Sequence, residues 1–171
     1  MSVSANGQER VLITAQGYEQ LGRDLDRLRN EERQRLARLL LDACADGNLS
    51  DNPTLVDLLD EQAELERRIA TLEAQLAVAQ IAPPPLAGHA AVGSVVRVRD
   101  LGRDAVVDYE LVGPLEGDPI NGRVSIAAPI GRALVGKRRG AQVEVATPRG
   151  IVALEVTDVR PAPHALADQA A

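Results

Sequence analysis

The sequence predicts an α+β fold in which an N-terminal antiparallel two-helix coiled coil precedes a small, mostly antiparallel β domain. Three observations predict it. Apolar residues recur in alternating steps of three and four on both sides of a short turn, a triple proline follows, and beyond Gly93 the apolar period changes to two. Two helices joined by so short a turn lie antiparallel, so the turn, residues 46–53, is the far tip of a hairpin.

The first helix is expected to run from Ala15 to about Ala45. Thr14 is its expected N-cap, because a threonine hydroxyl can accept a hydrogen bond from an unpaired N–H of the first turn. A strict repeat would place Glu32 and Arg35 on the apolar stripe, which predicts a local slip of the seam and not a break. The stripe consists of Tyr18, Leu21, Leu25 and Leu28, and then of Leu36, Leu39, Leu40 and Ala43.

The second helix is expected to begin near Pro53, a residue that suits a first helical turn, with Asn52 or Asp51 as its cap. A lone helix with so narrow a stripe would leave its leucines in water, so the two helices must pair. Each buried leucine contributes about 2 kcal/mol. The seam of this helix is Leu58, Gln62, Leu65, Ile69, Leu72, Leu76 and Ala79.

The triple proline that follows Ala82 ends the second helix, because it forbids a helix and favours an extended connector. The expected organisation is an N-terminal tail over 1–13, the hairpin over 14–81, a Pro-rich linker over 82–92, the β domain over 93–160 and a flexible tail over 161–171. Strands are expected after Gly93 and over 106–112, 123–127, 143–146 and 151–159, with a short helix around 132–135.

Composition narrows the possible functions. The chain has no Trp or Phe and only two tyrosines, Tyr18 and Tyr109, which argues against an aromatic-lined ligand pocket. Residues 1–87 hold 15 Asp and Glu against 9 Arg, whereas residues 88–171 hold 10 of each sign. A nonspecific DNA binder is usually basic, so we expect no DNA binding, sequence-specific binding included, and leave protein partners open.

The single cysteine, Cys44, cannot form an internal disulfide, which suits a reducing compartment. We expect it to be a small buried residue near the helix end and not a nucleophile. The chain shows no signal peptide and no apolar run near the ~18 residues of a membrane span. We therefore expect a cytoplasmic monomer that does not enter membranes. No phosphate-binding glycine loop or zinc spacing is visible, His89 and His164 are expected to be solvated, and no cofactor is expected to bind the chain alone.

Four segments in order resemble the motifs of a known family: Ile13–Tyr18 with Leu21, Gly47–Asn52, Ser125–Lys137 and Val145–Gly150. They are similar, in turn, to a Thr followed by Gly and Leu, to the tip motif GDL-x-EN, to S-x-x-SPI-(A/G)-x-x-L-(I/L)-GK, and to a VxTPxG turn. On these motifs the chain, over roughly residues 11 to 159, resembles the Gre family of bacterial transcript-cleavage factors, GreA and GreB.

The resemblance implies an FKBP-like β domain and RNA polymerase as the partner. In the family the β domain docks at the rim of the polymerase secondary channel, and the coiled coil enters the channel toward the catalytic centre and the RNA 3′ end. Two acidic tip residues there help hold a second Mg²⁺ and activate water, and the polymerase cuts its backtracked RNA. The implied docking residues are Pro129, Ile130, Leu134 and Lys137, although β-domain core is an equally good interpretation of the three apolar ones.

The tip departs from the family pattern. The two family acids fall on Asn48 and Asp51, so one carboxylate is lost, and Ser50 replaces the usual Lys. Our first hypothesis is a factor that occupies the channel and modulates or inhibits transcription with weak or no cleavage stimulation. It is expected not to be an enzyme and to have no catalytic residue. Asp51 is the possible ligand of a shared Mg²⁺, and the other tip residues are Asp46, Gly47, Leu49, Ser50 and Asn52.

Two alternatives stay open. Asp46 and Asp51 could together hold the metal, which would keep the chain an active cleavage-stimulating factor. The chain could instead be a coiled-coil adaptor unrelated to polymerase, whereas a prolyl isomerase would need more aromatic residues than Tyr109. The arginines of the first helix could form a basic patch toward RNA, but interleaved acids make an ordinary solvated face at least as good an interpretation.

Overall fold

The computed structural model describes residues 10–45, 53–147 and 150–163, which form two compact units. One unit consists of the described residues up to Tyr18 together with those from Ala79 onward, and we call it the sheet unit. The other, Glu19–Val78, is the hairpin unit. The expected fold class is confirmed, because a long helical hairpin is followed in sequence by a β-sheet domain.

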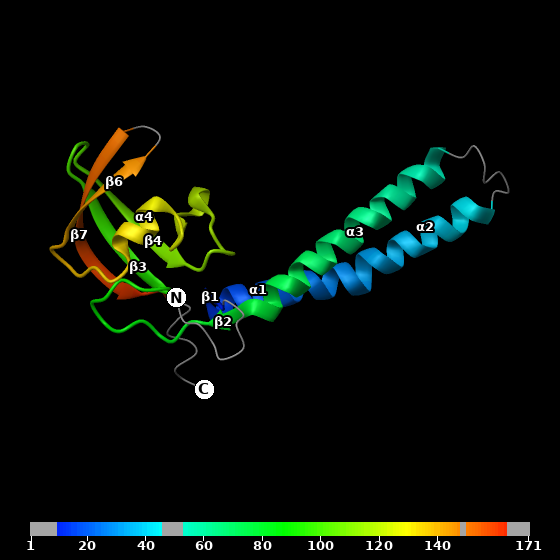
Figure 1. Ribbon diagram of the computed structural model, residues 1–171, viewed down its shortest axis with the longest axis horizontal. Coiled ribbons are helices and arrows are strands. Elements are labelled where there is room, and N and C mark those ends of the chain that lie inside the picture. The colour runs from blue at the N-terminus through cyan, green and yellow to red at the C-terminus, as the bar shows by residue number, and fades with distance from the viewer. Residues whose placement is uncertain (1–9, 46–52, 148–149, 164–171) are drawn as a thin grey trace. The chain divides into compact units, whose positions relative to one another are not determined.

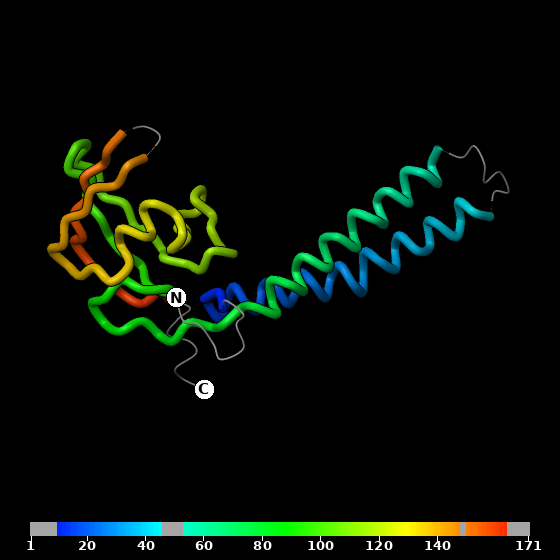
Figure 2. Tube along the Cα trace, viewed as in Figure 1, coloured from blue at the N-terminus to red at the C-terminus, as the bar shows by residue number. Residues whose placement is uncertain are grey.

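The hairpin unit consists of two antiparallel helical arms (Figures 1 and 2). The first arm is continuous through α1 (Ala15–Arg27), a π-helical turn η1 (Leu28–Glu32) and α2 (Arg33–Ala45), and the second is α3 (Pro53–Val78). The arms pack through a single seam of aliphatic side chains, as the sequence predicts. Its buried members are Leu25, Leu28, Leu36, Leu65 and Ile69, with Leu40, Leu58, Leu72 and Leu76 packed against them.

The π-helical turn explains the slip of the seam. The N–H of Arg33 donates to the carbonyl of Leu28, five residues back instead of four. The wider turn accommodates one extra residue, and the helix that follows keeps its orientation. Leu28 and Leu36 are eight positions apart, but they face the seam as residues seven positions apart do on a regular α-helix. Both side chains are buried, at 4% and 2% exposure. The seam therefore continues across the irregularity.

Ion pairs flank the seam on both sides. Arg29 and Arg33 pair with Glu73 and Glu66 on one flank, and the Arg33–Glu66 contact is bidentate at 2.9 and 2.6 Å. On the other flank Arg35 reaches Glu61 at 2.5 Å. Because these side chains are about half exposed, water screens each pair and each contributes little to stability. They make an ion-paired solvated face the better interpretation of these three arginines.

The sheet unit is built on a five-stranded sheet in the order β5-β4-β3-β7-β6 (Figure 1). All neighbours are antiparallel except β4 and β5, so the sheet is mixed. One face packs on the short helix α4 around Val96, Val98, Leu111, Leu134 and Val156. The strands are β3 (Ser94–Asp100), β4 (Ala105–Val112), β5 (Arg123–Ser125), β6 (Gln142–Thr147) and β7 (Gly150–Pro161), and α4 spans Pro129–Leu134.

A second, two-stranded sheet was not expected from the sequence. Strand β1 (Val11–Ile13) pairs in parallel with β2 (Ala79–Ile81). The segment expected to be an N-terminal tail thus contains a strand, and α3 ends at Val78, three residues before the expected end of the hairpin. Residues 1–9 of the N-terminal tail and residues 164–171 of the C-terminal one, including His164, lie outside the described residues.

Cys44 corrects another expectation. Its side chain is exposed and not buried, because the seam near the end of α2 runs through Leu36 and Leu40, and Cys44 lies beside it. His89 is half-buried, where full solvation was expected. Among the described residues, no helix is both long and apolar enough to cross a bilayer.

The outer face of the sheet carries a cluster of charged side chains. Asp108 on β4 accepts two hydrogen bonds from Arg97, directly opposite on β3, at 2.7 and 2.9 Å, and one from Arg160 on β7 at 3.0 Å. The hydrogen bonds from Arg97 lower the pKa of Asp108 below its ordinary value of 3.8; partial burial opposes this shift, and the charges of both arginines add to it. The ionised carboxylate is thus stabilised in the folded state.

Deleting Asn30, an exposed residue inside the π-turn, should convert that turn to α-helix and leave the seam in phase. We expect equal or higher stability, by up to about 1 kcal/mol, because an ordinary backbone hydrogen bond is regained. Deleting the exposed Arg38 is the matched control. It moves either Leu36 or Leu40 out of the seam and should cost about 2 kcal/mol. Thermal unfolding followed by circular dichroism measures both, and equal losses would contradict the absorbed-residue account.

Replacing Asp108 with Asn should lower stability at neutral pH by less than about 1 kcal/mol, since the group is about a third exposed. The folded-state pKa is depressed, so the contribution of Asp108 is fully present above its unfolded pKa and disappears as pH falls through the lower folded value. Urea unfolding measured from pH 7 down to about pH 2 should show the two proteins converging only below the ordinary aspartate range. A constant gap across that range would show that the effect is not electrostatic.

Candidate functional site

The tip is the first candidate site, and the hairpin leads to it from both sides. Helix α2 ends at Ala45 and α3 begins at Pro53, the residue predicted for its first turn. The tip residues, Asp46, Gly47, Asn48, Leu49, Ser50, Asp51 and Asn52, lie outside the described residues. Their roles therefore stay predictions. Within the described part of the chain, no group of three or more His, Cys, Asp or Glu side chains is placed to hold a metal ion.

The expected docking residues divide between surface and core. Leu134 is completely buried in the sheet-unit core, and Ile130 is half-buried against it. Pro129 and Lys137 are exposed at the two ends of this segment. The segment is fixed by backbone hydrogen bonds from Ala90 to Lys137 at 2.9 Å and from Gly136 to Ala90 at 2.7 Å. The core interpretation thus holds for Leu134, and a docking role for the other three stays a prediction.

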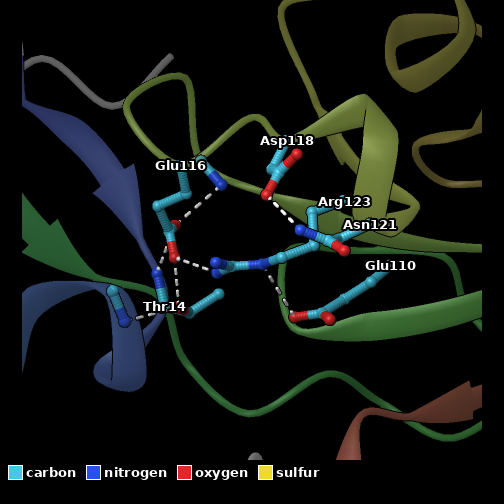
Figure 3. A network of polar contacts seen from close by, with 8 residues as sticks. Thr14, Glu110, Glu116, Asp118, Asn121 and Arg123 are labelled. Carbon is cyan, nitrogen blue, oxygen red and sulfur yellow. Dashed lines mark hydrogen bonds and ion pairs between the residues drawn. The ribbon is translucent and has the colours of Figure 1, made fainter. Parts of the chain in front are cut away.

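A buried polar network in the sheet unit was missed by the sequence analysis (Figure 3). Its centre is Glu116, whose side chain is 3% exposed. The carboxylate accepts hydrogen bonds from the Thr14 N–H at 2.8 Å, from the Gly113 N–H at 2.9 Å and from Arg123 at 3.1 Å, and it also contacts the Thr14 hydroxyl. Buried charges persist only when they are paired in this way.

Thr14 joins this network to the start of α1. Its hydroxyl accepts a hydrogen bond from the Gly17 N–H at 2.9 Å, which confirms the predicted N-cap. Gly17 has to be a glycine here, because a Cβ atom would lie 2.0 Å from a carboxylate oxygen of Glu116. The first turn of α1 and the Glu116 loop are thus in direct contact within the sheet unit.

Arg123 is the cation of the network. Its guanidinium lies between Glu116, at 3.1 Å, and Glu110, at 3.8 Å. Its backbone N–H donates to the carbonyl of Asp118 at 2.9 Å, which closes the loop around the short 3-10 turn Pro119–Asn121. The side-chain amide of Asn121 donates to Asp118 and lowers the pKa of that carboxyl, against a smaller effect of desolvation.

The network supports structure, since the buried Glu116 carboxylate is satisfied by Thr14, Gly113 and Arg123. Sequence reasoning could find only the Thr14 N-cap, because a threonine that directly precedes a helical pattern indicates a cap. It could not find Glu116. Thr14 and Glu116 are 102 positions apart. The remaining signal was the short sequence Gly113-Pro114-Leu115-Glu116, where an acid follows directly on a turn.

Comparisons with known proteins match nearly the whole described chain. The family model described as "Transcription elongation factor, N-terminal" matches residues 11–81, and "Transcription elongation factor, GreA/GreB, C-term" matches residues 85–161. A protein of Syntrophobacter fumaroxidans named transcription elongation factor GreA is 37% identical over 153 residues, 88% of this chain and 98% of that protein. A protein of the same name from Thermoanaerobacter pseudethanolicus is 36% identical over 152 residues, 88% and 97% of the two chains.

The solved structure described next superposes only loosely on this chain. The crystal structure of GreA factor homolog 1 (Gfh1) from Thermus thermophilus is 29% identical, covers 88% of this chain and 99% of that one, and gives a TM-score of 0.42. The family assignment therefore rests on the sequence matches alone.

These matches correct one expectation. The chain was expected simply not to be an enzyme, on the ground that its tip has lost a carboxylate. Its relatives at 37% and 36% identity are named transcription elongation factor GreA, the group that the resemblance connects with stimulated RNA cleavage. A plain exclusion from catalysis is therefore wrong for this chain.

Gly113 provides a test of the network's geometry. A Cβ there would lie 2.0 Å from the backbone oxygen of Leu12 and 2.9 Å from Glu116, so Gly113→Ala should destabilise the protein by about 2–3 kcal/mol. Gly22→Ala is the control, because nothing lies within 4 Å of its Cβ and alanine favours a helix, so a gain of about 0.5–1 kcal/mol is expected. Chemical denaturation measures both. A neutral Gly113→Ala would show that β1 can move away from the loop.

Proposed function

The chain belongs to the GreA/GreB family of transcription elongation factors, and from this premise we propose that it binds bacterial RNA polymerase and modulates or inhibits transcription. In this proposal the hairpin enters the secondary channel of the polymerase, and cleavage stimulation is weak or absent in comparison with a factor that carries two tip carboxylates. The sheet unit docks at the channel rim through Pro129, Ile130 and Lys137, with Leu134 supporting them from the core. The protein acts as a monomer in the cytoplasm.

The observation that carries the proposal is the residue at position 48. Asn48 stands where the family motif has an acid, and Asp51 keeps the second acidic position with a side chain one methylene shorter than the usual Glu. Carboxylate and amide oxygens both suit a hard cation such as Mg²⁺, so the donor types fit a shared ion. The formal charge does not match the family pattern, because an amide is neutral.

We expect the loss of one negative charge at position 48 to weaken Mg²⁺ binding more than the change from a carboxylate oxygen to an amide oxygen does. Removing one formal charge next to a divalent ion weakens its binding on the order of several kcal/mol at low effective dielectric. When bound, a second Mg²⁺ in a two-metal centre activates water and stabilises the leaving oxygen. Asp51 alone would hold and orient such an ion less firmly than two carboxylates, while the hairpin could still occupy the channel.

The main alternative is a factor that keeps strong cleavage stimulation through Asp46 and Asp51. It is favoured by the relatives named GreA and by the fact that α2 ends at Ala45, directly before Asp46. The family matches leave no support for an adaptor unrelated to transcription. The two remaining functions differ in the rate at which the polymerase shortens backtracked RNA in the presence of this chain.

The test is RNA shortening in a stalled, backtracked elongation complex of bacterial RNA polymerase. We expect slow shortening with the wild-type chain and an increase of about tenfold or more with Asn48→Asp, since 1.4 kcal/mol of restored stabilisation corresponds to tenfold in rate. Asn52→Asp adds the same charge at a tip position where the family motif has Asn and should have little effect.

Two further results discriminate between the functions. Run-off transcription at saturating protein should fall below the level without it, and an unchanged yield would contradict a role in the channel. Rapid shortening by the wild-type chain that is lost in both Asp46→Ala and Asp51→Ala would favour the alternative.

A further inference from the structure

The segment that follows α4 is exposed along its whole length and carries three consecutive cations. Helix α4 ends at Leu134, and every residue over 135–140 is exposed. We call residues 135–140 the basic loop, after its members Lys137, Arg138 and Arg139. Because the three cations are consecutive within six residues, they belong to one protrusion of the sheet unit.

Backbone hydrogen bonds hold the basic loop at both ends. At its start the N–H of Gly136 donates to the carbonyl of Ala90 at 2.7 Å, and at its end the N–H of Gly140 donates to the carbonyl of Val156 at 2.7 Å. Both glycines have left-handed backbone, with φ of 77° and 85°, which lets the chain turn sharply there. A loop fixed in this way presents its cations at a low entropic cost when a partner binds.

The three cations of the basic loop have no acidic partner in the part of the chain that the structure describes. On the outer face of the same sheet, by contrast, Arg97 and Arg160 both bind Asp108. Residues 124–143 hold four Arg and Lys and no Asp or Glu, in a chain whose net charge is −6. The basic loop is therefore a local positive region of an acidic protein, and its chemistry fits an anionic partner.

The surroundings of the loop favour an acidic protein surface over nucleic acid. A nucleic acid extends well beyond six residues, and outside 124–143 residues 88–171 hold six Arg against ten Asp and Glu, which repel further phosphates. Single strands also stack on aromatic rings, whereas Tyr109 packs against the core. An acidic patch on a folded protein is local, and arginine pairs well with its carboxylates. Val135, 42% exposed within the loop, adds the aliphatic contact common in protein interfaces.

We propose that the basic loop is an electrostatic docking surface for an acidic patch of a partner protein, with Arg138 and Arg139 among its contacts. The inference rests on the proposed function, which makes RNA polymerase the partner and assigns Lys137 and α4 to the channel rim. Pro129 and Ile130 then supply apolar contact, and the loop supplies an attraction that acts before contact. Because such exposed charges act at long range, the loop raises the rate of association more than it slows dissociation.

The test is the association and dissociation of full-length protein and RNA polymerase, measured by biolayer interferometry at low and at high salt. The double variant Arg138→Gln, Arg139→Gln leaves Lys137 in place. It should lower the association rate at least about fivefold at low salt. At high salt the difference should shrink to less than about twofold, because ions screen exposed charges.

Two controls separate charge from structure. The matched single pair is Arg138→Gln against Arg103→Gln, since Arg103 is an exposed arginine in the turn between β3 and β4 and its replacement removes the same charge elsewhere on the sheet unit. Arg103→Gln should leave the association rate nearly unchanged. The variant Arg138→Lys, Arg139→Lys keeps both charges and should retain the wild-type rate and its salt dependence. Unchanged thermal unfolding of the variants confirms that the sheet unit is intact.

Each outcome supports or overturns a defined claim. If the wild-type chain does not bind polymerase, the proposed function fails, and this inference fails with it. If the wild type binds and the Gln double variant has the same rates and salt dependence, the inference alone is overturned. Equal losses from Arg138→Gln and Arg103→Gln, or a loss in the Lys double variant, also overturn it. Binding of single-stranded RNA or duplex DNA alone, or a wild-type dimer in light scattering, overturns it when the Gln double variant abolishes that binding, because the anion is then a nucleic acid or a second copy.

Discussion

The hairpin depends on one narrow seam of aliphatic side chains that must stay in phase along its whole length. An α-helix drifts by about 20° over each heptad relative to a strict repeat, so a long pair of helices tolerates little error in phase. One residue too many between Leu28 and Leu36 would rotate every later leucine away from α3. The chain resolves this at the π-turn, where the Arg33 N–H reaches back to Leu28. Without that turn, Glu32 and Arg35 would face the seam and bring charged side chains into its apolar interior.

The sheet unit is organised by a different kind of constraint, a buried charge that demands partners. Glu116 gathers the N-cap of α1, the backbone of Gly113 and the guanidinium of Arg123 around a single carboxylate. Two glycines make this approach possible, because a Cβ at Gly17 would collide with the Glu116 carboxylate and a Cβ at Gly113 would collide with the Leu12 carbonyl. Such a network is costly when incomplete, so it specifies one arrangement of the β1 strand, the first helical turn and the loop after β4. Its role is to define geometry more than to add net stability.

Sequence reasoning succeeded where the physics is local and periodic. The two helices, Thr14 as a cap, Pro53 as a first-turn residue and most strand positions follow from steps of three and four, from capping chemistry and from alternation. The seam slip was visible as a misplaced Glu32, although its π-helical form was not. What could not be predicted is mostly long-range. The pairing of β1 with β2 and the contact of Thr14 with Glu116 join segments far apart in sequence, and no short pattern records such partners. The strands β4 and β5 are close in sequence, but no local pattern records that they pair in parallel. The exposure of Cys44 was missed because Cys44 lies next to the predicted stripe, beside Ala43, and sequence alone does not fix the width of the seam.

The residues that hold the helical hairpin together are different from the residues of the tip motif, so the tip can change its chemistry within the same fold. The seam, the ion pairs and the π-turn determine where the two helical arms end, at Ala45 and Pro53, and none of their members belongs to the tip motif. The replacement of the family's acid by Asn48 removes one charge from the tip motif, and it changes none of the seam, ion-pair or π-turn residues. Under the proposed function, the residues that hold the arms together and the residues that would act at the tip are therefore separate sets.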